Sequence, residues 1–272
     1  MLKTFGKVAS RGFLLAAALV AGGPAVVVTA RADILGLDNG ANYTLNNSGT
    51  GGPTVSGGTA TLTDNGFSEA RSLYYNTPQN ISGGFQAAFT YRAAGGGSGG
   101  PADGITFDLQ NQGIHALGAG GNGLGYRGIA PSAAVEFNVY ALNVVGTAYH
   151  TNGAVLGYMS TAPVDISSGD QIAVTLTNNA STNTLTEVLK DLNNGNTFST
   201  SYSTNLAAVL GGSTALVGFT GGTGGGTSIQ TVSDFSFITT ATVPEPASLG
   251  MLGMGVLGVI GYAWNRRKRA SA

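Results

Sequence analysis

The sequence has no cysteine, and only 9% of its 272 residues are charged. The absence of cysteine excludes disulfide bonds, thiolate metal sites and thiol catalysis, so a folded exported domain must be stabilised by its core. The chain has only two histidines, His115 and His150, and it lacks the H-E-x-x-H zinc motif. It also lacks repeats of solenoid or propeller length, and its 45 glycines follow no collagen-like period.

Basic residues are scarce between positions 33 and 242. This stretch holds twelve acidic but only four basic residues, a net charge of −8, because the other eight basic residues lie in the two terminal segments. The four are Arg71, Arg92, Arg127 and Lys190. Such a domain repels polyanions, which excludes nucleic acid and strongly anionic polysaccharides as favoured partners. Neutral ligands or cations suit it better.

Residues 1–32 are typical of a secretory signal peptide. Three basic residues near the start precede an apolar run that extends to residue 28, and Ala30-Arg31-Ala32 supplies a small-x-small cleavage pattern. We therefore expect a signal helix that is removed after Ala32. The alternative is an uncleaved transmembrane anchor, which the Gly-Gly-Pro interruption at 22–24 disfavours. The basic residues are Lys3, Lys7 and Arg11.

The last thirty residues combine three parts. Val243-Pro244-Glu245-Pro246 is followed by uncharged residues 247–264 and then by an arginine and lysine cluster at 266–269. An apolar helix of this length is about sufficient to cross a bilayer core of roughly 30 Å. The basic cluster would keep the extreme C-terminus in the cytoplasm and the preceding chain outside. We expect a transmembrane helix at about 247–264.

This order of parts resembles the PEP-CTERM sorting signal. The resemblance implies recognition by an exosortase-type membrane protease, with processing near Pro244, Glu245 and Pro246. It also implies export through the inner membrane of a Gram-negative, exopolysaccharide-producing bacterium. The C-terminal helix would anchor the chain there before its transfer to the cell surface or the extracellular matrix. The chain thus divides into a signal peptide (1–32), one domain (33–242) and a sorting segment (243–272).

The sequence pattern of the domain indicates strands joined by polar, glycine-rich turns. In the segment 133–140, small and apolar residues alternate with Glu136, Asn138 and Tyr140, so one face is expected to meet a core and the other solvent or a site. This pattern predicts an all-β fold, an antiparallel β-sandwich or jelly roll, with one short helical turn near 205–210. The predicted strands are 84–91, 104–110, 133–140, 171–177, 184–189, 214–220 and 229–238.

From about residue 84 the order of motifs resembles the legume-type (L-type) lectin domain, a concanavalin-like sandwich. The matching pieces cover roughly 150 residues. They are Ala102–Phe107 (ADGITF), the glycine loop 118–128, Ala134–Asn138 (AVEFN), 185–190, Val217–Gly224 (VGFTGGTG) and Val232–Phe237 (VSDFSF). Residues 33–83 fit more loosely, as opening strands. The resemblance implies a carbohydrate-binding module.

The resemblance also implies a sugar site. In that family an Ala-Asp-Gly turn, often with a cis peptide bond, carries the aspartate that accepts hydrogen bonds from sugar hydroxyls, and Asp103 matches it. A glycine loop presents backbone N–H groups, for which Gly121 or Asn122 is expected. The full set of expected sugar contacts is Asp103, Gly121, Asn122, Tyr140, Asn143, Gly222 and Thr223. The loop also contains two literal G-x-G-x-x-G matches, which lack the strand–turn–helix frame of a dinucleotide site.

The metal ligands of that family are incomplete in this sequence. Glu136 and Tyr140 are kept, but Asn138 stands where a shared aspartate belongs. Leu142 occupies the position of an asparagine, and His150 falls about two residues short of the expected spacing. Calcium prefers several oxygen ligands that include carboxylates, so the loss of a central carboxylate weakens the site. We expect weak or absent metal binding, and therefore no required cofactor.

We expect a non-catalytic protein that binds a neutral glycan or exopolysaccharide. A glycosidase needs two carboxylates about 5–10 Å apart, and although Asp103 and Glu136 offer a pair, nothing in the sequence assigns an acid and a base. Two alternatives remain open: a structural matrix protein that keeps the lectin sandwich without a sugar site, and a glycan hydrolase.

Overall fold

The structure is a computed structural model that describes residues 33–37, 40–49, 51–97 and 100–240. The predicted signal helix (1–32) and the predicted transmembrane helix (247–264) lie outside these ranges. Within them, no helix has the length and hydropathy needed to cross a membrane.

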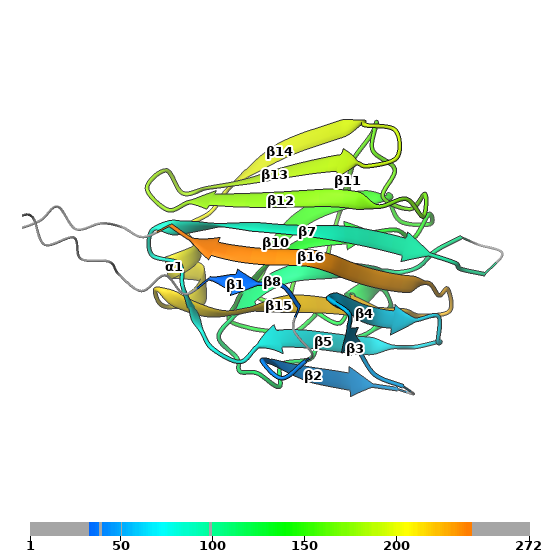
Figure 1. Ribbon diagram of the computed structural model, residues 1–272, viewed down its shortest axis with the longest axis horizontal. Coiled ribbons are helices and arrows are strands. Elements are labelled where there is room, and N and C mark those ends of the chain that lie inside the picture. The colour runs from blue at the N-terminus through cyan, green and yellow to red at the C-terminus, as the bar shows by residue number, and fades with distance from the viewer. Residues whose placement is uncertain (1–32, 38–39, 50, 98–99, 241–272) are drawn as a thin grey trace, which may run out of the picture. The chain divides into compact units, whose positions relative to one another are not determined.

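Two antiparallel sheets form the domain, one lying in front of the other in Figure 1. The first, which we call the β7 sheet, has the order β14 (Thr197–Ser203), β13 (Thr184–Asp191), β12 (Ile172–Asn179), β7 (Gly84–Ala94), β16 (Ile229–Thr239), β4 (Thr59–Asp64) and β3 (Thr54–Ser56), with β1 (Ile34–Leu35) beside β16. The second, the β8 sheet, has the order β11 (Met159–Ser160), β10 (Gly146–Thr151), β9 (Ser132–Asn138), β8 (Gly104–Gln110), β15 (Thr214–Gly222), β5 (Ala70–Tyr75) and β2 (Tyr43–Ser48), with β6 (Gln79–Asn80) beside β15.

The predicted all-β sandwich is confirmed. Each of the seven predicted strands corresponds to an observed strand, and β8 has the predicted bounds. The predicted helical turn is α1 (Leu206–Leu210), whose first turn is capped by the Asn205 side chain and which ends at Gly211 with φ 72°. The predicted strand 133–140 is shorter at its end, because Val139 and Tyr140 leave the sheet to begin the next loop.

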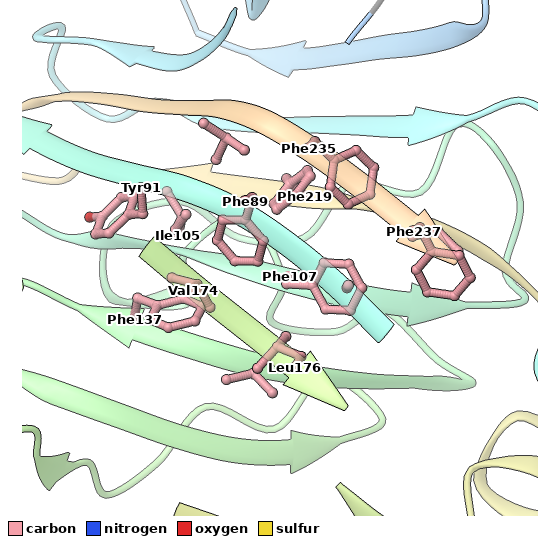
Figure 2. Packing of buried hydrophobic residues seen from close by; sticks show 14 of the residues in the cluster. Phe89, Tyr91, Ile105, Phe107, Phe137, Val174, Leu176, Phe219, Phe235 and Phe237 are labelled. Carbon is pink, nitrogen blue, oxygen red and sulfur yellow. The ribbon is translucent and has the colours of Figure 1, made fainter. Parts of the chain in front are cut away.

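The main core lies between the two sheets and is rich in phenylalanine. Phe107 of β8 lies at its centre, with rings of the β7 sheet, such as Phe89, and of β15 around it, as Figure 2 shows. Alternate residues of β8 and β9, such as Ile105 and Phe137, point into this core. The ring centroids around Phe107 lie 5.6–6.4 Å away, within the usual range for favourable aromatic pairs.

A second, smaller core lies on the opposite face of the β8 sheet, under the loops 113–130 and 152–158. Its members are Tyr74, Ala116, Leu124, Tyr126, Ile129, Ala134 and Val155, with Tyr158 packed against them. One face of the segment 133–140 was expected to meet solvent or a site. The face that carries Glu136 and Asn138 is not open to solvent, because both side chains are completely buried. The loops therefore form a roof over one face of the β8 sheet.

Candidate functional site

Asp103 lies at the junction of three loops. It precedes β8, and the peptide bond that joins it to Ala102 is cis. Its N–H donates to the carbonyl of Gly222 at 3.0 Å, and its carbonyl accepts from the N–H of Val139 at 2.9 Å. The main chain of this one residue therefore ties the end of β15 and the loop after β9 to the start of β8.

The Asp103 carboxyl group is buried but has an unused acceptor. The residue is 5% exposed, and Oδ2 has no hydrogen-bond partner in the described residues. Burial raises its pKa to about 6, and a backbone hydrogen bond from Gly224 opposes that rise. A Cβ atom would lie 3.2 Å from Oδ2 if added at Gly224 and 3.9 Å if added at Gly121. Glycine backbone at positions 121 and 224 therefore lies close to this oxygen.

The glycine loop is fixed against the loop that follows β15. It contains the 3-10 turn η1 (Gly121–Gly123), and the Gly121 N–H donates to the carbonyl of Thr223 at 2.9 Å. Asn122, the next residue, is exposed. The N–H group of Gly121 is thus engaged within the protein, whereas the side chain of Asn122 faces outward.

Thr223 connects the same loop to the segment before β5. Its hydroxyl accepts from the N–H of Glu69 at 3.0 Å and donates to the carbonyl of Gly66 at 2.7 Å. Glu69 is completely buried and forms an ion pair with Arg71. Gly222 and Thr223 therefore hold the loops together, through a carbonyl group and a hydroxyl group respectively.

The loop 139–145, between β9 and β10, carries the two remaining predicted contacts. Tyr140 is half-buried, and a Cβ atom on Gly226 would come within 3.7 Å of its Cε2 atom. The Asn143 N–H donates to the carbonyl of Tyr140 at 3.0 Å. The amide nitrogen of Asn138 donates to the carbonyls at both ends of the loop, those of Tyr140 at 3.1 Å and Val144 at 2.9 Å.

A surface cleft of about 300 Å³ lies beside these loops. Asn122 of the glycine loop and Asn143 of the 139–145 loop both line it. The lining residues are Asn122, Arg127, Asn143, Val144, Val155, Leu156, Gly157 and Tyr158. Leu156 and Val144 are strongly exposed, at 71% and 52%. The cleft thus offers amide groups, one guanidinium group and a short apolar wall.

Comparison with protein families agrees with this arrangement. The model of the legume lectin domain matches residues 67–250, which is more than half of the chain. The chain belongs to the legume lectin domain family. The model of the PEP-CTERM protein-sorting motif matches residues 242–268, so this lectin-family chain also carries that sorting motif.

Solved structures of plant proteins share the fold of this legume lectin domain. The lectin from Bauhinia forficata in complex with GalNAc is 18% identical, with a TM-score of 0.66, over 78% of this chain and 99% of that one. Arcelin-5, a lectin-like defense protein from Phaseolus vulgaris, is 19% identical with the same TM-score and coverage. Lectin II from Ulex europaeus is 19% identical, with a TM-score of 0.64, over 76% and 97%.

The residues of this lectin domain do not fit the metal site that the resemblance implies. Asn138 donates to carbonyls at the position of the shared carboxylate, and no group of three His, Asp or Glu side chains suited to a metal ion occurs in the described part of the chain. Glu136 is completely buried, and its Oε1 lies 3.0 Å from His150 Nδ1. Burial raises the pKa of Glu136, and the neighbouring His150 opposes that rise.

The structure therefore places most of the predicted site residues in two groups. Asp103, Gly121, Gly222 and Thr223 are joined by backbone hydrogen bonds, and Asn122 and Asn143 share the cleft.

Two features were missed. The cleft wall of Arg127 and 155–158 comes from the loops that roof the sheet, and no motif marked it. His150 contacts Glu136 despite its short spacing, because β10 pairs with β9 and places His150 opposite Ala134.

Proposed function

We propose that this legume lectin-family domain is a non-catalytic carbohydrate-binding module for a neutral glycan or exopolysaccharide. The observation that carries the proposal is the Asp103 carboxyl group, whose Oδ2 is buried without a partner at the junction of the site loops. An unmet acceptor of this kind costs free energy, and a sugar hydroxyl donates to a carboxylate in a strong charge-assisted bond. The net charge of the domain favours an uncharged ligand.

The surrounding residues have separate roles in this proposal. Asn122 and Asn143, at the cleft, offer amide groups to sugar hydroxyls, and the Tyr140 ring beside Gly226 offers an apolar surface. Gly121, Gly222 and Thr223 position the loops through their backbone and hydroxyl bonds.

Binding on a glycan array, with and without calcium, tests the proposal. The wild-type protein is expected to bind at least one neutral glycan, and Asp103→Asn to lose roughly ten- to a hundredfold in affinity, since a bond to a charged acceptor contributes about 1.5–3 kcal/mol. Asp234→Asn is the matched control, because Asp234 is exposed on β16 of the other sheet. The absence of binding to every neutral glycan under both conditions would remove the proposal.

We further propose that the chain is exported and sorted through its C-terminal motif. In this proposal an exosortase-type protease of the inner membrane processes the chain near Pro244-Glu245-Pro246, after cleavage of the signal peptide following Ala32. The match to the PEP-CTERM motif supports the C-terminal part. The mature protein would then lie at the cell surface or in the extracellular matrix. Mass spectrometry of the mature protein tests both cleavages, and a mass equal to that of the full chain would exclude them.

A structural matrix role is the second candidate. It is favoured by one observation: the Gly121 N–H and the Thr223 hydroxyl, two groups expected to meet a sugar, are engaged within the protein. A glycan array without any bound sugar, together with retention of the folded protein in the host matrix, would favour this role. A hydrolase is less well supported, because Glu136, the second carboxylate, is completely buried and bonded to His150. A reducing-sugar assay would detect one.

A further inference from the structure

One amide group bridges the two ends of the loop 139–145. Asn138 is the last residue of β9 and is completely buried. Its Nδ2 donates to the carbonyl of Tyr140 at 3.1 Å and to that of Val144 at 2.9 Å, so a single side chain fixes both ends of the loop. The loop in turn contributes Asn143 to the cleft and the Val139 N–H to the Asp103 carbonyl.

Two carbonyl oxygens that face one buried point are stabilised there by a positive partner, although the Tyr140 carbonyl also accepts from the Asn143 N–H at 3.0 Å. A divalent cation with a carboxylate is one solution, because hard cations bind carbonyl and carboxylate oxygens together. A primary amide is another, since it presents two N–H donors and no charge that must be desolvated. Asn138 supplies the second solution, with its two donors placed on the two carbonyls.

The neighbouring carboxyl group on the same face of β9 is partly satisfied within the protein, since Glu136 Oε2 and Asn138 Oδ1 have no hydrogen-bond partner in the described residues. Glu136 lies two residues before Asn138, and its Oε1 is paired with His150 Nδ1. The described residues contain no third His, Asp or Glu side chain grouped with this pair. In the region where the family resemblance implies a metal site, the chain thus places the Asn138 amide and the Glu136–His150 pair.

We propose that Asn138 is a positioning residue that replaces a bound cation, so that the site loops of this protein keep their geometry without divalent metal. The same two carbonyls become a calcium cradle when the amide is changed to a carboxylate. Asp at this position would place its oxygens beside the carbonyl oxygens of Tyr140 and Val144, which repel it unless a cation intervenes.

Thermal unfolding of the full-length protein in excess chelator and in added calcium chloride provides the test. The wild-type midpoint is expected to be the same in both. Asn138→Asp is expected to unfold at a lower temperature in chelator and to recover in calcium. The matched control is Asn178→Asp, which loses the bond from another buried amide to one carbonyl, that of Thr184 at 3.3 Å, and has no second carbonyl to complete a cradle. It is expected to be destabilised equally in chelator and calcium.

A wild-type midpoint that rises in calcium, or an Asn138→Asp variant that calcium does not recover, would overturn the proposal. Where Asn138→Asp does not fold, Asn138→Ala replaces it, with amide hydrogen exchange as the measurement. Exchange in residues 139–145 is then expected to be roughly tenfold faster, because two hydrogen bonds to the loop are lost.

Asn111→Ala is the control for that second measurement. Asn111 also donates from Nδ2 to two carbonyls, those of Leu210 and Thr214 at 2.9 Å, but near α1. Its loss is expected to leave exchange in 139–145 unchanged. Unaltered exchange in Asn138→Ala would exclude the positioning role. These measurements need no glycan, so they stand or fall independently of the proposed sugar binding.

Discussion

The two faces of the β8 sheet are built from the same strands but with opposite chemistry. Toward the β7 sheet, β8 presents Ile105, Phe107 and Leu109 to an apolar core. Toward the loops, it presents Thr106, Asp108 and Gln110, all completely buried. Because successive residues of a strand point to opposite faces, one sequence specifies both environments.

Side chains on the polar face donate hydrogen bonds to backbone carbonyls of the loops that cover it. Thr106 and Thr220 share a hydrogen bond of 2.8 Å, and Thr220 donates onward to the carbonyl of Leu124 at 2.7 Å. Ser72 donates to the carbonyl of Ala116 at 2.7 Å. Loop backbone cannot satisfy itself in a sheet-like ladder, so the strands beneath must provide partners. The apolar face therefore stabilises the sandwich, and the polar face fixes the loops that shape the site.

Truncation of Phe107 is expected to have the largest effect. Phe107→Ala removes a ring that contacts the rings of both sheets, and a buried Phe→Ala change costs about 3–5 kcal/mol. Urea unfolding of the full chain measures the loss. Phe67→Ala is the control, because Phe67 is 71% exposed and its change is expected to cost less than about 0.5 kcal/mol. Equal losses in the two variants would contradict the assignment of the core.

The polar face is expected to make stability depend on pH. Burial raises the pKa of Asp108 to about 7, although the Tyr74 hydroxyl donates to it at 2.9 Å and opposes the rise. The ordinary value is 3.8, so between about pH 4 and 7 the folded state holds a proton that the unfolded state has released. Stability therefore falls as pH rises through this window, by up to about 1.4 kcal/mol per pH unit for this one group.

Asp108→Asn removes this contribution while retaining an acceptor for Tyr74. The slope of unfolding free energy against pH is expected to become shallower by about one proton, although Glu187, whose pKa burial also raises to about 7, keeps part of it. Urea titrations at several pH values measure the slope. Asp234→Asn, at an exposed position, is expected to leave it unchanged. An unaltered slope in Asp108→Asn would show that Asp108 is ionised in the folded protein.

The smallest expected effect is a loss of glycan affinity without a loss of stability. Gly224→Ala places a Cβ atom 3.2 Å from Asp103 Oδ2, whereas Gly225→Ala meets no atom within 4 Å. The first variant is expected to lose roughly tenfold in glycan affinity, equivalent to about 1.4 kcal/mol, and the second to keep it. Both should unfold close to the wild-type midpoint. Titration calorimetry with a glycan from the array measures the difference, and equal affinities would mean that Oδ2 is not a contact.

Sequence alone predicted the parts of the fold whose pattern is simple. The β8 and β9 segments alternate between large apolar residues and others, and their strands lie within two residues of the prediction. Other strands were not predicted. β14 (Thr197–Ser203) lies at the sheet edge and is mostly serine and threonine, although its exposure alternates, and the short β10 (Gly146–Thr151) is buried only in its first half. Neither therefore has the run of apolar residues that marks a buried strand.

The sequence predicted the parts of the candidate site that have a local motif. It did not predict the parts that are formed by contacts between distant segments. Asp103 and the glycine loop have local signatures. The cleft wall at 155–158 has none, because it depends on how the loop after β10 folds over the sheet. The spacing of residues along the chain did not indicate the contact between His150 and Glu136. The β9–β10 register brings their side chains together. The two hydrogen bonds that Asn138 donates depend on where the loop carbonyls lie, which no sequence pattern reveals.

The scarcity of basic residues bears on the resistance of the folded domain to proteolysis. Enzymes that cut after lysine or arginine find only four such residues between positions 33 and 242. Arg71 is completely buried, and Arg92 and Lys190 lie within paired strands of the β7 sheet. Only Arg127 is exposed on a loop, at the edge of the cleft. The folded domain therefore offers such proteases one accessible bond, and a ligand seated in the cleft would shield it.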